Sequence, residues 1–227
     1  MLLRQLFDYE TYTYTYLVAC EETKQAILID PVREQMDRDL ALIEQLGLRL
    51  VYILDTHVHA DHVTAAGPLA DKTGAKTVGG GGAGCTDLVV QHGDTLEVGS
   101  LRVEVLATPG HTDDSLSFRV GDAVFTGDAL FVRGCGRTDF QNGDPSTLYD
   151  SITRVLFALP DDTRVFPGHD YRGHTMSTIG EEKRWNPRLA GKSREAFIQI
   201  MDNLGLAPPK HIHEAVPANR ACGRAAG

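Results

Sequence analysis

Four side chains that can bind a metal ion lie within six residues of the sequence, at His57, His59, Asp61 and His62. They directly follow the apolar run Leu50–Leu54, which is predicted to be a buried strand. Strand ends project side chains into a shared crevice, and imidazole together with carboxylate suits zinc, iron or manganese. Because such a density of ligands is rare by chance, the segment predicts a metal site.

Three further residues fit the same interpretation. His111 lies in the turn TPGHT, Asp128 ends the segment FTGD, and His169 lies in FPGHD. Each follows a predicted strand, as the first cluster does. A single residue of this kind is more often part of a turn than a ligand, but together with the first cluster these residues indicate a common metal site.

The elements that must position these residues alternate between strands and helices. The strands are predicted at Tyr12–Val18, Lys24–Asp30, Leu50–Leu54, Leu101–Leu106, Ser115–Val120, Ala123–Thr126 and Arg164–Phe166. The helices are predicted at Met36–Leu46, Pro145–Leu159 and Ser193–Leu204, and the tail after Pro208 is predicted to be a loop. This mixture predicts an α/β or α+β fold.

Length and composition exclude several classes of protein. The 227 residues carry a net charge of −9, which argues against a nucleic-acid partner because such proteins need a basic face. No apolar stretch reaches the roughly 18 to 20 residues of a membrane span, and the first ten residues do not look like a signal peptide. The four cysteines form no CxxC pair. We therefore expect a cytoplasmic protein with reduced thiols, folded as a single domain over residues 1–227.

The order of the motifs resembles that of the metallo-β-lactamase superfamily. HxHxDH stands at 57–62, PGHT at 109–112, GD at 127–128 and GHD at 168–170. The resemblance implies a four-layer αββα sandwich with the metal site along one edge of its two sheets. The motifs are far more specific for this fold than for a reaction, because the superfamily includes hydrolases, oxidoreductases and nucleases.

Further segments are similar to those of persulfide dioxygenases, also called sulfur dioxygenases. They are RGCGRTDFQ at 133–141, GHDYRG at 168–173, EEKRWNPR at 181–188, NLGL at 203–206 and AVPAN at 215–219. This resemblance implies oxidation of glutathione persulfide by O2 to sulfite and glutathione. It also implies one Fe(II) per chain, held by His57, His111 and Asp128, and a homodimer. His59, Asp61, His62 and His169 would then orient the ligands and water.

Two residues are candidates for contact with glutathione. Arg137 and Tyr171 match positions that contact glutathione in the related glyoxalase II enzymes, and the guanidinium of an arginine suits a carboxylate.

The main alternative is a dinuclear zinc thioesterase of the glyoxalase II kind, which hydrolyses S-acyl glutathione. Asp61, His62 and His169 would hold its second metal, and His59 would join the first. A binding module without catalysis is a weaker alternative, because no ligand is missing. Metal content and oxygen uptake distinguish the two enzymes.

Overall fold

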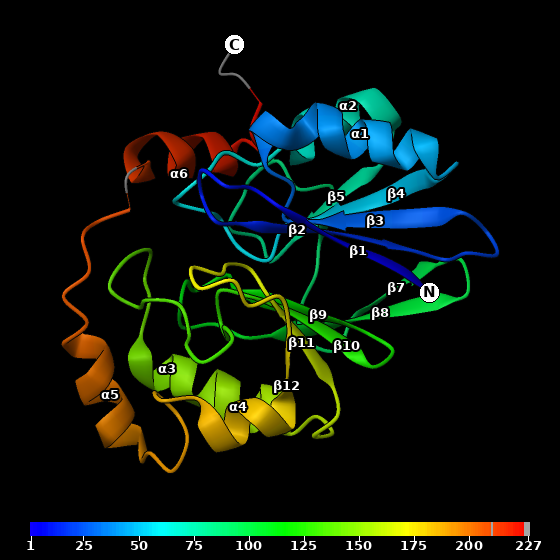
Figure 1. Ribbon diagram of the computed structural model, residues 1–227. Coiled ribbons are helices and arrows are strands. Elements are labelled where there is room, and N and C mark those ends of the chain that lie inside the picture. Colours follow the sequence, from blue (N-terminus) through cyan, green and yellow to red (C-terminus); the bar gives the residue numbers. More distant parts are fainter. Residues whose placement is uncertain (210, 225–227) are drawn as a thin grey trace. The chain divides into compact units, whose positions relative to one another are not determined.

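The computed structural model describes residues 1–209 and 211–224. The chain divides into two compact units. Unit 1 comprises Met1–Val90, Thr95–Val103 and the described residues from Pro208 onward, and unit 2 comprises Gln91–Asp94 and Glu104–Ala207. Strands and helices occur in both units, which confirms the mixed class (Figure 1). No helix in the described part of the chain is both long and apolar enough to cross a membrane.

Unit 1 contains a six-stranded sheet in the simple order β1 to β6. The first three strands pair antiparallel, and β3, β4, β5 and β6 pair parallel. The carboxyl ends of β3 and β4 therefore lie at the same edge, where a ligand site is expected. The strands are β1 (Leu2–Phe7), β2 (Tyr14–Ala19), β3 (Gln25–Ile29), β4 (Arg49–Leu54), β5 (Lys76–Gly79) and β6 (Leu88–Val89).

Two helices cover one face of this sheet (Figure 1). The helix α1 (Met36–Gln45) follows a short 3-10 turn, η1 (Arg33–Gln35), and α2 (Ala66–Thr73) connects β4 to β5. Ile43 of α1 and Leu69 of α2 join one buried cluster with the sheet residues. The helix predicted from Met36 is confirmed. Gly47 follows it with a φ of +61°, a conformation that glycine adopts readily.

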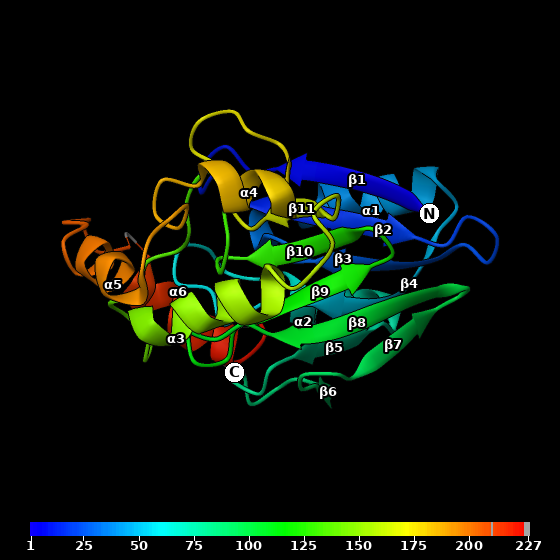
Figure 2. The same cartoon turned by 90° about the horizontal axis from the view of Figure 1, so that it is seen from below.

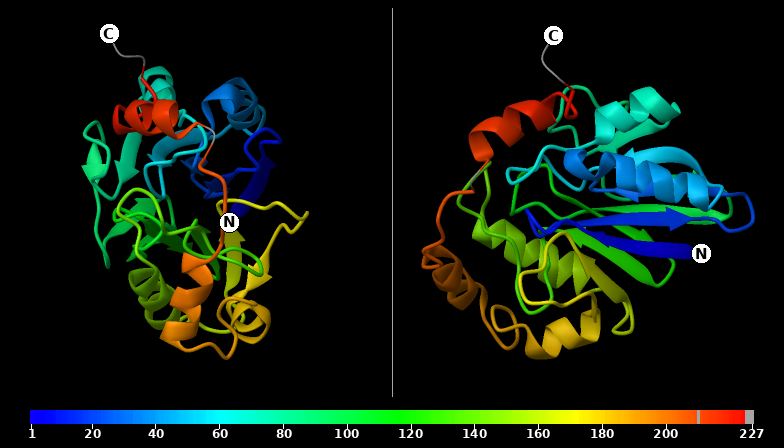
Figure 3. Two further views of the ribbon diagram at one scale, coloured as in Figure 1. Left: turned by 90° about the vertical axis from the view of Figure 1, so that its left-hand side faces the viewer. Right: turned by 45° about the horizontal axis from the view of Figure 1, so that its top comes forward.

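The prediction of a loop after Pro208 is wrong. Residues Ile212–Arg220 form the helix α6 of unit 1, which contains Pro217 (Figure 3). A proline inside a helix removes one hydrogen bond and normally argues against helix. Burial of Ala215 and Asn219 offsets this cost. Tertiary packing, not local preference, therefore determines the helix.

The second sheet has the order β12-β11-β10-β9-β8-β7. β9 and β10 pair antiparallel (Figure 2), whereas β10 and β11 pair parallel. The carboxyl ends of β10 and β11 consequently lie side by side, where Gly127 is in register with Pro167. The strands are β7 (Thr95–Val98), β8 (Leu101–Ala107), β9 (Leu116–Val120), β10 (Ala123–Gly127), β11 (Arg164–Pro167) and β12 (Ser177–Thr178).

Three helical segments in unit 2 share a buried core with its strands. They are α3 (Pro145–Asp150) with its π-helical continuation η2 (Ser151–Leu156), α4 (Ile179–Trp185) and α5 (Arg194–Asp202). Leu148, Ile152 and Phe197 pack with Val124 of β10. Ser193 caps α5 by accepting a hydrogen bond from the backbone N–H of Ala196, as its residue type predicts. The helices predicted from Pro145 and from Ser193 are confirmed.

Candidate metal centre

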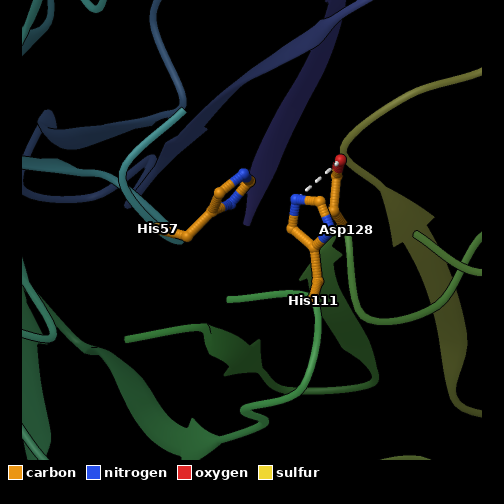
Figure 4. Close-up of side chains that lie close together, drawn as sticks. All are labelled: His57, His111 and Asp128. Carbon is orange, nitrogen blue, oxygen red and sulfur yellow. Dashed lines mark ion pairs between the residues drawn. The ribbon is translucent and has the colours of Figure 1, made fainter. Parts of the chain in front are cut away.

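Three predicted site residues of unit 2 meet around one carboxylate. Asp128 follows β10, His169 follows β11, and His111 lies in the turn after β8. Nδ1 of His169 lies 2.7 Å from Oδ1 of Asp128. Nε2 of His111 lies 3.5 Å from the other oxygen, Oδ2 (Figure 4). The parallel pairing of β10 and β11 thus brings His169 to one oxygen of the carboxylate, and the turn after β8 brings His111 to the other.

A hydrogen bond at its other nitrogen sets the tautomer of His111. Nδ1 of His111 lies 2.7 Å from the backbone carbonyl oxygen of Arg137. A carbonyl oxygen only accepts, so Nδ1 carries the proton and Nε2 carries the lone pair. Metal-binding histidines are typically held in this way, with one nitrogen donating to a carbonyl and the other directed to the metal.

Two glycines allow this close packing around Asp128. A Cβ atom at Gly136 would lie 2.3 Å from the backbone oxygen of Asp128 and 2.9 Å from Nδ1 of His111. A Cβ atom at Gly168 would lie 2.6 Å from Oδ1 of Asp128. A side chain at Gly136 would collide with the backbone of Asp128 and the ring of His111, and one at Gly168 would collide with the carboxylate of Asp128. Both glycines therefore have a steric role.

In unit 1, His57 follows β4 and is anchored through Thr56 and Asp30. The Oγ1 hydroxyl of Thr56 donates to Asp30 over 2.9 Å, and its backbone N–H donates to the same carboxylate over 2.7 Å. Nδ1 of His57 lies 2.9 Å from that hydroxyl oxygen. Because the hydroxyl proton is given to Asp30, the oxygen accepts from Nδ1, and Nε2 of His57 carries the lone pair that a metal requires.

Asp30 is not among the site residues predicted from the motifs. It follows β3, whose carboxyl end shares an edge with that of β4, and its side chain is buried. One feature of the sequence could have indicated it. Asp30 stands at the end of the predicted strand Lys24–Asp30, just as the HxHxDH motif follows the predicted strand Leu50–Leu54. Only the parallel pairing of β3 with β4 shows that the two strand ends meet.

His59 and His62 are buried, and each has one ring nitrogen without a hydrogen-bond partner. Nε2 of His59 lies 3.1 Å from Asp30, and Nδ1 of His62 lies 2.9 Å from Asp61. Nδ1 of His59 and Nε2 of His62 are the unpartnered atoms. Leaving a buried polar atom unsatisfied costs about 1–3 kcal/mol, and a metal ion is a chemically suitable partner for an imidazole nitrogen.

One electrostatic and one geometric feature distinguish this part of unit 1. Burial tends to lower the pKa of His59, but the nearby carboxylate of Asp30 outweighs it and raises the pKa to about 9. The ligand atoms of His59, Asp61 and His62 lie within 4.8 Å of one another. By this geometry, the three residues form a group within unit 1 that could itself hold a metal.

The two predicted glutathione contacts have different surroundings within unit 2. The guanidinium of Arg137 donates to both oxygens of Asp139, at 2.6 and 2.7 Å, and to the carbonyl oxygens of Leu206 and Ala207. Tyr171 is 64% exposed, and its ring stacks on that of His169 with an interplanar angle of 6°. Arg137 thus already binds a carboxylate of its own chain, whereas Tyr171 presents an exposed ring beside His169.

The prediction of four reduced thiols is wrong for two of the cysteines. Cys85 and Cys222 form a disulfide across a separation of 137 residues. The fold brings their Cα atoms to 5.9 Å, which a bridge requires, and sequence spacing carries no signal of this. Cys20 and Cys135 are free and buried.

Comparisons with known proteins identify the family. The family model of the metallo-beta-lactamase superfamily matches residues 8–88 and 86–169. The mitochondrial persulfide dioxygenase ETHE1 of Homo sapiens is 47% identical to this chain, over 98% of this chain and 89% of the human one. The crystal structure of ETHE1 from Myxococcus xanthus matches with a TM-score of 0.97 and 64% identity, over 99% of this chain and 100% of that chain.

A relative of the alternative class is more distant. A probable hydroxyacylglutathione hydrolase of Schizosaccharomyces pombe is 37% identical, over 86% of this chain and 88% of that one. The lower identity and coverage rank the thioesterase behind the dioxygenase. The fold and the resemblance predicted from the motifs are confirmed. The chain belongs to the metallo-β-lactamase superfamily and, within it, to the persulfide dioxygenase family.

Proposed function

We propose that this protein is a mononuclear iron dioxygenase that oxidises glutathione persulfide with O2 to sulfite and glutathione. The observation that carries the proposal is the 47% identity to a persulfide dioxygenase over 98% of the chain. His57, His111 and Asp128 would hold one Fe(II) per chain. The reaction balances with one water consumed and two protons released for each persulfide and O2.

The donor set fits this metal. Two imidazoles and one carboxylate are the ligands typical of oxygen-activating non-haem iron, and they leave coordination positions open. When bound, Fe(II) supplies redox chemistry with O2, which zinc cannot supply. Other residues of the chain orient the two histidine rings. The carbonyl of Arg137 fixes the ring of His111, and the Thr56 hydroxyl fixes the ring of His57.

A second candidate is the dinuclear zinc thioesterase, which would use the group formed by His59, Asp61 and His62 in unit 1. The unpartnered Nε2 of His62 favours this candidate, because a second metal would satisfy that atom. In the dioxygenase these residues orient ligands and water instead. His169 is already paired with Asp128, which is compatible with such a role.

Metal analysis and oxygen uptake separate the two candidates. We expect protein purified without oxygen to hold about one iron per chain, and to consume O2 and form sulfite when glutathione persulfide is added. An oxygen electrode and metal quantification measure both quantities. Two zinc ions per chain, no oxygen uptake and rapid hydrolysis of S-lactoylglutathione would instead establish the thioesterase.

Arg137 is proposed to bind a carboxylate of the substrate. We expect Arg137→Ala to raise KM about 10- to 100-fold with iron content unchanged, because a charge-assisted hydrogen bond is worth about 1.5–3 kcal/mol. Iron should remain because His111 is held by the backbone carbonyl of Arg137, not by its side chain. Steady-state kinetics on iron-quantified enzyme measure both effects.

Asp139→Ala is the matched control for Arg137. Asp139 accepts hydrogen bonds from Nε and Nη2 of Arg137, a pair of donors that can bind a carboxylate through both of its oxygens. A substrate carboxylate must therefore compete with it. Removing Asp139 should lower KM or leave it unchanged, opposite in direction to Arg137→Ala. An unchanged KM in fully iron-loaded Arg137→Ala would exclude the arginine from substrate binding.

A further inference from the structure

One buried amide of unit 1 binds the backbone of the HxHxDH loop. Asn219, in the last turn of α6, is only 3% exposed. Its Nδ2 donates to the carbonyl oxygens of His59, over 2.9 Å, and His62, over 2.8 Å. Its Oδ1 accepts from the backbone N–H of Thr64 over 2.8 Å. Both N–H groups and the carbonyl of a single side chain are thus used by a segment more than 150 residues away.

These bonds reach the proposed ligand His57 through a chain of contacts. Asn219 holds the backbone of His59, whose Nε2 lies 3.1 Å from Asp30. Asp30 accepts from Thr56, and the hydroxyl of Thr56 lies 2.9 Å from Nδ1 of His57. A shift of the loop at His59 would therefore disturb the carboxylate that orients His57.

The turn after α6, next to Asn219, packs closely on the segment that follows the HxHxDH loop. A Cβ atom at Gly223 would lie 1.9 Å from the carbonyl oxygen of Thr64, and one at Gly67 would lie 2.6 Å from that of Cys222. The backbone N–H of Gly67 donates to Cys222 over 2.8 Å. Figure 3 shows α6 beside α2, which begins at Ala66. The Cys85–Cys222 disulfide ties the same turn covalently to the loop between β5 and β6.

We propose that Asn219 is a positioning residue of the metal centre, which fixes the HxHxDH loop so that its side chains are arranged for the metal before it binds. The proposal rests on the proposed function only in placing a metal at this loop. Asn219 itself touches neither metal nor substrate, so it acts through His59 and Asp30. Loss of comparable supporting contacts costs about 10- to 100-fold in metal affinity or activity.

Two substitutions distinguish positioning from simple space filling. Asn219→Asp has nearly the same shape and retains an acceptor for the N–H of Thr64, but it loses both donors and places oxygen opposite the carbonyls of His59 and His62. Asn219→Ala loses all three bonds. Space filling predicts that the aspartate variant is the milder one. Positioning predicts that it retains metal no better than the alanine variant.

The readout is the rate at which Fe(II) is lost to a chelator, together with the visible spectrum of the Co(II)-substituted protein. We expect both variants to lose iron about ten times faster or more, with an altered Co(II) spectrum and a lower kcat at nearly unchanged KM. Arg224→Ala is the control. Arg224 lies on the same terminal segment as Asn219, and its exposed ion pair with Asp71 of α2 does not involve the HxHxDH loop. It should release iron at the wild-type rate.

Wild-type metal loss and spectrum in Asn219→Asp would overturn the proposal, as would wild-type behaviour of Asn219→Ala. The variants are compared in the oxidised state, in which the Cys85–Cys222 disulfide keeps the segment attached. The metal measurements do not depend on turnover. If wild-type protein binds metal but does not oxidise glutathione persulfide, the proposed function fails while the role of Asn219 is still decided by metal retention.

Discussion

Replacing His111 by alanine should lower the affinity for iron roughly 100-fold and reduce O2-dependent turnover at least about 100-fold. Structural zinc sites gain about 10–16 kcal/mol of binding free energy from four ligands, so one ligand contributes about 3 kcal/mol, and we expect a similar share for His111. Nε2 of His111 is directed at Asp128, and its Nδ1 is held by the Arg137 carbonyl, so the ring is already oriented for a metal. Metal quantification and an oxygen electrode measure the two losses.

His213→Ala is the matched control for this variant. His213 is an exposed imidazole on α6, and its removal should change neither iron content nor turnover. Added imidazole should partly restore iron binding to His111→Ala by entering the space left by the ring. Full iron occupancy in His111→Ala, with wild-type turnover, would show that His111 is not a ligand.

Glu182→Ala should lower the free energy of unfolding by about 3–5 kcal/mol, the usual cost of removing one partner of a buried ion pair. Glu182 is completely buried on α4 and pairs with the guanidinium of Arg133. It also accepts from the backbone N–H of Arg133, from the hydroxyl of Ser177 and from Nδ2 of Asn186. Its loss removes the acceptor of the Arg133 backbone N–H and one acceptor of the buried Asn186 amide. Urea unfolding followed by circular dichroism measures the change.

Glu181→Ala provides the comparison, because Glu181 pairs with the same guanidinium over 2.7 Å but its side chain is 41% exposed. Exposed pairs contribute about 0–1 kcal/mol, so this variant should remain close to wild type. Glu182→Gln serves if Glu182→Ala does not fold, since it retains the shape and should show a smaller loss than alanine. Equal effects of Glu181→Ala and Glu182→Ala would contradict the argument from burial.

The Glu182 network also matters for the metal centre. It holds Arg133, which begins the loop that carries Gly136 and Arg137. Gly136 lies against Asp128, and the carbonyl of Arg137 binds His111. We therefore expect Glu182→Gln to release iron faster than wild type even where it remains folded. The Glu182 network thus supports the candidate ligands Asp128 and His111 indirectly, through the loop that follows Arg133.

Much of the fold and of the candidate site could be predicted from local patterns. Apolar runs predicted the strands β4, β10 and β11, because the alternation and length of such runs reflect burial within a few residues of chain. Histidine and aspartate directly after those strands indicated a metal site, because strand ends project side chains into a shared crevice and these residue types suit a metal. The pairing of β10 with β11 brings Asp128 and His169 together as this reasoning requires.

Only the tertiary structure decided which groups support the candidate ligands. Asp30 beneath His57, Asn219 on the loop at His59, and the Cys85–Cys222 disulfide each join residues far apart along the chain. The helix α6 contains a proline, and packing outweighs that local cost. Contacts of this kind leave no periodic or spacing signal, because their geometry depends on how whole strands and helices pack. The sequence by itself therefore determined the chemistry and the family, and the fold determined how that chemistry is held in place.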